Sequence, residues 1–256
     1  MMSENPNDRD PRRVSPHPVL TAYYRDEAGH RRFLTRLFDD TASQYDRISD
    51  LMSLGSGAWY RRYALRRAGL TEGMKVLDVA VGTGAFASAA MTIVGPWGSI
   101  VGVDPSTGML AQAHKKLGIR LSQGVAEALP FRDEHFDFTT MGYALRHVAD
   151  LRSMFAEHFR VLRREGTLLI VDFTRPRSRV GLGLGRFYLN VVVSWMARLG
   201  SGGGKEARLL VRYCWDSLEH LVTPETILAA MTSSGFVNVR RVGWFGILNE
   251  YVGRKP

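Results

Sequence analysis

The sequence of 256 residues is poor in cysteine, with Cys214 alone. One thiol excludes a disulfide framework and any zinc site built from several thiolates. Long hydrophobic runs are also lacking: the best candidate, 187–199, is shorter than the roughly 20 residues that cross a bilayer. The first thirty residues mix acids with arginines and have no apolar core, so no export or organelle signal is expected. These absences predict a cytoplasmic location, with peripheral membrane contact as an alternative.

Acidic residues are too few to balance the basic ones: 34 Lys and Arg against 25 Asp and Glu give a formal net charge of +9. Such a balance raises the question of a nucleic acid, an anionic membrane or an acidic substrate. The basic run that contains aromatic residues, YRRYALRR at 60–67, is short, and no RNA-binding appendage is recognisable. We therefore expect no nucleic-acid partner. A solvated, arginine-rich surface explains most of the charge.

The chain divides into five predicted parts, which its hydrophobic patterning defines. They are a flexible tail (1–18), an N-terminal helical cap (19–72), an α/β core (73–175), a helical insertion or lid (176–222) with a flexible loop at 201–205, and a C-terminal helix with closing strands (223–256). In the core, five apolar runs (74–80, 98–104, 119–124, 136–142 and 166–173) alternate with helical segments (85–94, 107–117 and 151–162). This alternation predicts an α/β fold with a doubly wound, mostly parallel sheet.

The most informative segment is VLDVAVGTGAFASAA at 76–90. An apolar strand ends in Gly82-Thr83-Gly84 and opens a helix, the turn in which glycines permit a tight bend and close backbone approach to a ligand. Asp104 closes the next strand, where a carboxylate can accept a hydrogen bond from a ribose hydroxyl. The pattern predicts an adenosine-containing cofactor. The alternative for Asp104 is an ordinary turn residue before Pro105.

Asp78 separates two chemistries that use this turn. A carboxylate inside the strand would repel the pyrophosphate of a nicotinamide cofactor but suits an ammonium group. S-adenosylmethionine has an amino group, a sulfonium and a ribose, and no phosphate. A cap or salt bridge within the turn is the alternative role for Asp78. Two other function classes stay open: a nicotinamide oxidoreductase, and a protein that binds the cofactor without catalysis.

Several motifs together resemble UbiE-type methyltransferases. They are VLDVAVGTGAF, VGVDPSTGML (101–110), GVAEALPF (124–131), FDFTTMGYALRHV (136–148), VLRREGTLLIVDFTRP (161–176) and VGRKP (252–256). Those enzymes use S-adenosylmethionine to C-methylate the ring of ubiquinone and menaquinone precursors. The resemblance runs from about residue 38 to the end of the chain. It implies a Rossmann-like class I methyltransferase sheet, a lipophilic quinol or phenol as substrate, and no metal.

The resemblance also implies site residues, position by position. Asp78, Gly82 and Gly84 match the positions that hold the amino acid end of the cofactor. Asp104 matches the ribose carboxylate, and Met109 matches an apolar residue beside the adenine. The remaining matches are Ala126 and Glu127, which border the adenine edge, and Tyr45, which closes over the cofactor.

Three positions depart from the family pattern. Val125 replaces the aspartate that is expected to contact the adenine amino group, so adenine recognition must use backbone or water. Val81 replaces a cysteine, which is a small apolar exchange. His147 lies in the reacting pocket, at a position where the family usually has asparagine. The identity of the substrate is therefore open. A polyketide, indole or prenyl substrate of specialised metabolism, methylated on carbon or oxygen, is therefore the alternative.

Methyl transfer to carbon requires a nucleophile made electron-rich by a neighbouring oxyanion, and a base that removes a proton. His147 is the candidate base because histidine titrates near operating pH. Arg146 is the candidate for stabilising the oxyanion, and Asp172 is predicted as a carboxylate of the pocket. The alternatives are a His147 satisfied by backbone groups at a helix end and an Arg146 paired with Asp150 or Asp172. Two further residues, Trp195 and Met196, would line an apolar pocket or the core. The oligomeric state is open.

Overall fold

A mostly parallel seven-stranded sheet organises the chain, with the strand order β3-β2-β1-β4-β5-β7-β6. The computed structural model describes residues 13–53, 55–175, 181, 183, 185, 187, 191, 204–244 and 246–256. Strand β7 is antiparallel to both β5 and β6, and the other pairs are parallel. The doubly wound α/β prediction is confirmed. The strands are β1 (Lys75–Val79), β2 (Ser99–Asp104), β3 (Arg120–Gln123), β4 (Phe136–Gly142), β5 (Leu162–Phe173), β6 (Val237–Trp244) and β7 (Leu248–Arg254).

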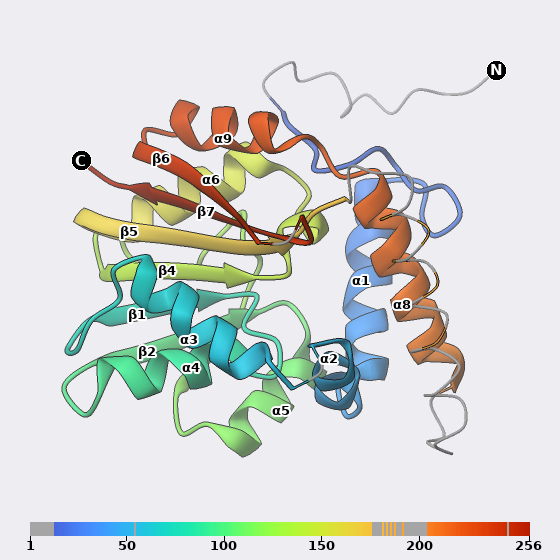
Figure 1. Cartoon of the computed structure of the whole chain (residues 1–256), viewed down its shortest axis with the longest axis horizontal. Coiled ribbons are helices and arrows are strands. Elements are labelled where there is room, and N and C mark those ends of the chain that lie inside the picture. Colours follow the sequence, from blue (N-terminus) through green and yellow to red (C-terminus); the bar gives the residue numbers. More distant parts are fainter. Residues whose placement is uncertain are drawn as a thin grey trace.

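Helices cover both faces of the sheet (Figure 1). One hydrophobic cluster joins the central strands to α3 and α4, and a second joins them to α6 and α9. Strand β1 has a run of four buried residues, which is the pattern of a strand covered on both faces. The helices are α1 (Glu27–Thr41), α2 (Tyr45–Ser53), α3 (Gly57–Arg67), α4 (Ala85–Val94), α5 (Thr107–Lys116), α6 (Leu151–Val161), α8 (Gly204–Glu219) and α9 (Pro224–Ser233).

A third hydrophobic cluster lies outside these layers, between α1 and α8. The two helices run side by side next to the carboxyl end of the sheet (Figure 1). Leu34 and Leu37 of α1 pack there against Leu210 and Tyr213 of α8. The cap is also joined to the core through Asp39, whose Oδ1 accepts hydrogen bonds from Ser106 Oγ (2.6 Å) and the Gly108 amide (2.8 Å). The cap therefore borders the edge of the sheet at which parallel-sheet proteins bind ligands.

Two of the predicted boundaries fall on residues that are hydrogen-bonded or helical. Within residues 13–18, assigned to a flexible tail, Val14 and Pro16 take part in hydrogen bonds to distant parts of the chain. The Val14 amide donates to Asp150, the Leu151 amide donates to Val14, and the Val222 amide donates to Pro16. Polar, proline-containing composition did not reveal these long-range partners. Of the loop predicted at 201–205, residues 204 and 205 belong to α8, which begins at Gly204, and the rest lie outside the described residues. Trp195 and Met196 lie outside the described residues.

Candidate functional site

A cavity at the carboxyl ends of β1, β2 and β4 brings together many of the predicted site residues. The space inside it is about 960 Å³, a figure that includes space open to solvent. Helices α1 and α2 form the wall opposite the sheet. The predicted residues that line it are Tyr45, Gly82, Asp104, Met109, Val125, Ala126, Glu127 and His147. We call it the reacting cavity.

The two glycines of the turn have different roles. Gly82 lines the reacting cavity, has a left-handed φ of +54°, and has open space where a side chain would begin. Its amide donates to Asp104 Oδ2 at 2.8 Å. Gly84, with φ +91°, does not line that cavity: a Cβ there would lie 2.3 Å from Leu117 Cδ1. Gly82 therefore provides close approach for a ligand, whereas Gly84 permits the packing of α4 beside Leu117.

Asp78 lies behind the turn and is almost fully buried, with 1% of its surface exposed. Neither of its carboxylate oxygens has a hydrogen-bond partner. Burial raises the pKa of Asp78 to about 8. The backbone amide of Ala87 and the charge of Arg61 oppose this shift, and the charge of Asp104 adds to it. A buried acid with unused oxygens is costly unless a partner arrives, so this residue fits a cationic ligand group.

Asp104 combines a local role with exposure to the reacting cavity. Its Oδ1 accepts from the Ser106 amide at 2.9 Å and its Oδ2 from the Gly82 amide at 2.8 Å. Burial raises the pKa of Asp104 to about 6, although these two amides favour the charged form. The turn role considered from sequence is therefore present, and the same carboxylate keeps lone pairs for ligand hydroxyls.

Arg61, which sequence reasoning did not single out, is a buried charge near Asp78. It belongs to α3, is 8% exposed, and has a buried Nε without a hydrogen-bond partner. Its charge acts on the pKa values of both Asp78 and Tyr143, so it lies near the end of the turn. A signal was available: Arg61 stands on the same stripe of the helix as the buried residues Tyr60, Ala64 and Leu65. A charge on the buried face of a helix indicates a function or a buried partner.

The residues expected around the adenine line one side of the reacting cavity. Met109 is buried in the first turn of α5, and Ala126 is buried in the loop after β3. Glu127 accepts a hydrogen bond from the Ala149 amide, which joins this loop to the segment that follows His147. The ring of Tyr45 meets Phe38 edge-on, with centroids 6.1 Å apart, on the α1–α2 side. Their placement agrees with an apolar slot bordered by backbone groups.

His147 reaches the reacting cavity from the short 3-10 helix 145–147 that follows β4. Tyr213 stacks on its ring at 5.5 Å between centroids, and Phe38 meets it edge-on at 5.3 Å. Its buried Nδ1 has no hydrogen-bond partner, so the interpretation of His147 as a helix-end residue satisfied by backbone is wrong for that atom. Burial, with the nearby charge of Arg146, lowers the pKa of His147 well below its ordinary value. The imidazole is therefore neutral at neutral pH, and its unpartnered Nδ1 is the atom available to accept a proton.

Arg146 and Asp172 form an ion pair behind His147. The Arg146 Nη1 to Asp172 Oδ1 distance is 2.5 Å, and both side chains are buried. Burial would lower the pKa of Arg146, but the Asp172 carboxylate raises it above its ordinary value. Asp172 does not line the reacting cavity, because it faces Arg146 and the Phe173 amide. The prediction of Asp172 as a carboxylate of the pocket wall is corrected: it is the partner of Arg146, while Asp150 caps α6.

Removal of one member of this pair is expected to destabilise the fold strongly. Arg146→Ala leaves the Asp172 carboxylate buried and unpaired, so the free energy of unfolding in urea should fall by about 3–5 kcal/mol. Arg163→Ala is the matched control, because the Arg163–Asp137 pair is 40% and 29% exposed. Loss of this partly exposed pair should lower the free energy of unfolding by less than about 1 kcal/mol. Equal losses in the two variants would contradict a structural role for the buried pair.

In the described part of the chain, no group of His, Cys, Asp and Glu side chains is arranged to hold a metal ion. None of the helices within the described ranges is long and apolar enough to span a bilayer. One cavity thus brings together Gly82 and Asp104 at one end of its lining and His147 at the other strand end.

The sheet order, the single antiparallel strand and the glycine turn define a class I S-adenosylmethionine-dependent methyltransferase. Solved structures agree on the fold. A methyltransferase from Aquifex aeolicus has a TM-score of 0.58 at 18% identity, over 80% of this chain and 97% of that one. Phosphoethanolamine N-methyltransferase 2 from Haemonchus contortus, solved with S-adenosyl-L-methionine, has a TM-score of 0.56 at 18% identity, over 77% and 53%.

The chain belongs to the ubiE/COQ5 methyltransferase family, whose model matches residues 26–255. Ubiquinone/menaquinone biosynthesis C-methyltransferase UbiE of Geobacter sulfurreducens is 34% identical, over 92% of this chain and 93% of that one. Its counterpart in Cronobacter sakazakii is 33% identical, over 80% and 83%. The predicted family, enzyme class and cofactor, S-adenosylmethionine, are confirmed.

Proposed function

We propose that this methyltransferase methylates a ring carbon of a lipophilic quinol or phenol. The observation that carries the proposal is the single cavity in which Gly82 and Asp104 share walls with His147. That arrangement supports a role for His147 as the proton acceptor that C-methylation of an aromatic ring requires. The names of the curated relatives, which refer to ubiquinone and menaquinone biosynthesis, support the substrate class.

The residues present fit the cofactor. The buried oxygens of Asp78 would accept the cofactor's ammonium, and the guanidinium of Arg61 would meet its carboxylate. Asp104 would accept from the ribose hydroxyls, while Met109 and Ala126 would pack on the adenine. When bound, S-adenosylmethionine supplies a methyl group on a positively charged sulfur. The protein's part is to align the ring carbon with that methyl group and to exclude water.

His147 is the proposed base. Its neutral imidazole accepts the hydrogen that leaves the methylated ring carbon, and the electron pair of the broken C–H bond returns to the ring. Arg146 holds positive charge directly behind His147, where it stabilises an anionic ring oxygen from a distance. Asp172 neutralises part of that charge. We therefore propose that the pair also orients the 145–147 turn, in addition to its electrostatic role.

The test uses a 1,4-naphthohydroquinone that carries one prenyl chain and one unsubstituted ring carbon, with isotopically labelled S-adenosylmethionine. Carbon NMR of the product distinguishes a methyl group on carbon from one on oxygen. Label on the ring carbon supports the proposal. Transfer to an indole or a polyketide phenol instead would favour a substrate of specialised metabolism. That alternative comes from His147 and Val125, which both depart from the family pattern. No transfer to the hydroquinone would overturn the quinol assignment.

We further propose that the outward face of α3 contacts anionic lipid. Trp59 and Tyr63 are 56% and 42% exposed and stack on each other at 5.5 Å between centroids. Arg62 and Arg66 of the same helix are also exposed. Aromatic and basic side chains together suit a negatively charged bilayer surface. Vesicles containing anionic lipid should co-sediment the protein, and the double variant Trp59→Ser/Tyr63→Ser should stay in the supernatant. Equal sedimentation of both proteins, or binding to neutral vesicles alone, would contradict this surface.

A further inference from the structure

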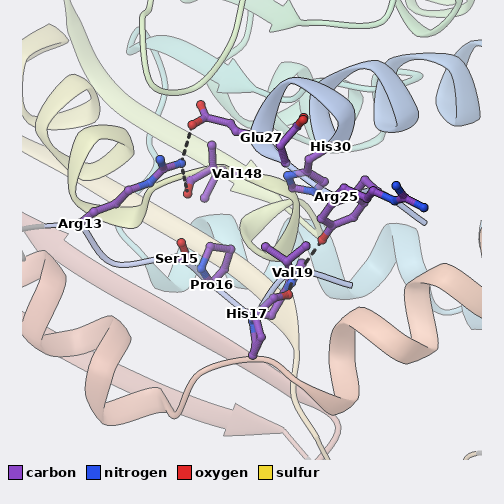
Figure 2. A pocket seen from close by; sticks show the side chains of 13 residues that line it. Arg13, Ser15, Pro16, His17, Val19, Arg25, Glu27, His30 and Val148 are labelled. Carbon is purple, nitrogen blue, oxygen red and sulfur yellow. Dashed lines mark hydrogen bonds and ion pairs between the residues drawn. The ribbon is translucent and has the colours of Figure 1, made fainter. Parts of the chain in front are cut away.

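A second cavity adjoins the reacting cavity on the side of the N-terminal segment. Figure 2 shows it, with Arg13, His17, Glu27 and His30 around it. Arg13 joins its walls, because Nη2 lies 2.8 Å from Glu27 Oε2 and 3.1 Å from the Ala149 carbonyl oxygen. We call it the outer cavity. It is open to solvent, and none of the site residues predicted from sequence lines it.

His30 lines both cavities. It lies in the first turn of α1, is 7% exposed, and stands in the wall that separates His147 from the outer cavity. Val148 and Ala149 are the other shared wall residues, and neither has a side chain that can carry a proton. Among the residues shared by the two cavities, His30 alone can accept and release a proton.

Tyr213 fixes the ring of His30. The Tyr213 hydroxyl lies 3.2 Å from His30 Nε2, and Tyr213 is fully buried in α8. The same tyrosine stacks on His147, so one side chain orients both histidines. On its other side, the His30 ring packs on Tyr24 at 4.4 Å between centroids. The imidazole is therefore held in place between the two cavities.

The proposed reaction releases one proton in each turnover, and that proton must leave a buried site. The ring carbon gains the methyl group and loses a hydrogen, which His147 takes up as a proton. An imidazolium at His147 would be buried beside Arg146, a costly arrangement that favours rapid transfer onward. Burial, with the charge of His17, lowers the pKa of His30 to about 4. Since the pKa of His147 lies well below its ordinary value, both histidines return to the neutral form when the proton reaches water.

Resting on the proposed function, we infer that His30 is a proton-relay residue that passes the ring proton from the reacting cavity to the outer cavity. His147 gives up the proton to His30 through a water or substrate oxygen in the cavity that both residues line. His30 then releases it to water on the outer side. Tyr213 is a positioning residue for this relay. The charged and titratable groups that face His30 are His17 and Tyr24 of the N-terminal segment, Glu27 and Arg31 of α1, His147 beyond β4, and Tyr213 of α8.

The test compares His30→Gln with wild type in turnover of the prenylated naphthohydroquinone. Glutamine keeps a hydrogen-bonding group for Tyr213 but cannot carry a proton at neutral pH. We expect kcat to fall about 100-fold, the scale of a lost proton-transfer group, and to recover as imidazole is added to the buffer. The kcat of Tyr213→Phe should fall less than that of His30→Gln, because the imidazole of His30 remains. His114→Gln, at an exposed histidine of α5, should match wild type with and without imidazole.

The outcomes separate this inference from the proposed function. A His30→Gln variant with wild-type kcat, or one whose loss imidazole does not reverse, overturns the relay while the quinol assignment stands. A wild-type enzyme that leaves the naphthohydroquinone unmethylated overturns the quinol assignment and the relay with it. Calorimetric titration with S-adenosylhomocysteine checks whether His30→Gln changes the shape of the reacting cavity. Unchanged affinity in His30→Gln together with imidazole recovery supports the relay, and a parallel loss of affinity contradicts it.

Discussion

Asp78→Asn is expected to weaken S-adenosylmethionine binding by about 100-fold or more. Removing one partner of a buried charge pair costs about 2–5 kcal/mol. Neither Asp78 oxygen makes a well-formed hydrogen bond within the protein, so the ammonium of the cofactor is the partner whose charge pairing the substitution removes. Calorimetric titration measures the affinity directly. Asp133→Asn, at a side chain that is 72% exposed, is the control and should bind like wild type.

The same substitution should leave the ligand-free protein as stable as wild type, or more so. Because burial raises the pKa of Asp78 to about 8, the folded state binds this proton more tightly than the unfolded chain does. The acid therefore opposes folding increasingly as pH rises from about 4 to 8. Asparagine removes that cost. A fall in the urea midpoint of Asp78→Asn at pH 7 would show that Asp78 has a structural partner and would contradict the assignment.

Cofactor binding should also release a proton below pH 8. Because burial raises its pKa to about 8, Asp78 is mainly protonated at pH 6–7 before the cofactor binds, and pairing with an ammonium requires the carboxylate. Calorimetry in two buffers of different ionisation enthalpy should therefore detect about one proton released per cofactor bound. The affinity should rise as pH increases from 6 to 7. Asp78→Asn should release no such proton, and proton release that persists in this variant would assign it to another group.

His147→Ala is expected to lower kcat by about 100-fold while leaving cofactor affinity nearly unchanged, because it removes a proton acceptor and no cofactor contact. His147→Asn should show a similar loss, since an amide is not a base. The imidazole is already neutral at neutral pH, so the wild-type rate should not fall between pH 8 and 6 through protonation of His147. Turnover of the naphthohydroquinone and calorimetry with S-adenosylhomocysteine measure the two effects. Full turnover in both variants would show that the base is elsewhere.

Much of the fold was predictable because its signals are local. Apolar runs of strand length, helical spacing and the Gly82–Gly84 turn each act within a few residues. Helix α4, for example, was predicted over 85–94 and spans Ala85–Val94. Where the N-terminal segment begins to make tertiary contacts was less predictable. Residues 13–18 are polar and look flexible, yet Val14 and Pro16 pair with backbone and side chains more than 130 residues away. Composition does not encode such partners.

The site also contains residues that the sequence predicts and residues that depend on packing. Asp104 and His147 were predictable because the carboxyl ends of neighbouring parallel strands meet at one edge, so strand-end residues converge. Asp172 also follows a strand, but the side chain of Arg146 occupies its oxygens and keeps it out of the cavity. Which of two adjacent polar side chains faces the cavity depends on rotamers and packing. Strand order alone does not determine it.

By itself, the sequence determined the sheet, the cofactor turn and the methyltransferase class, since periodicity and turn chemistry are properties of short segments. Tertiary structure alone decided which distant residues share the site. Arg61 lies beside Asp78 because α3 packs on α4. His30 faces both cavities, with Tyr213 against it, because α1 packs on α8. Helix-on-helix packing depends on the combined shape of many side chains, so no local pattern specifies these contacts.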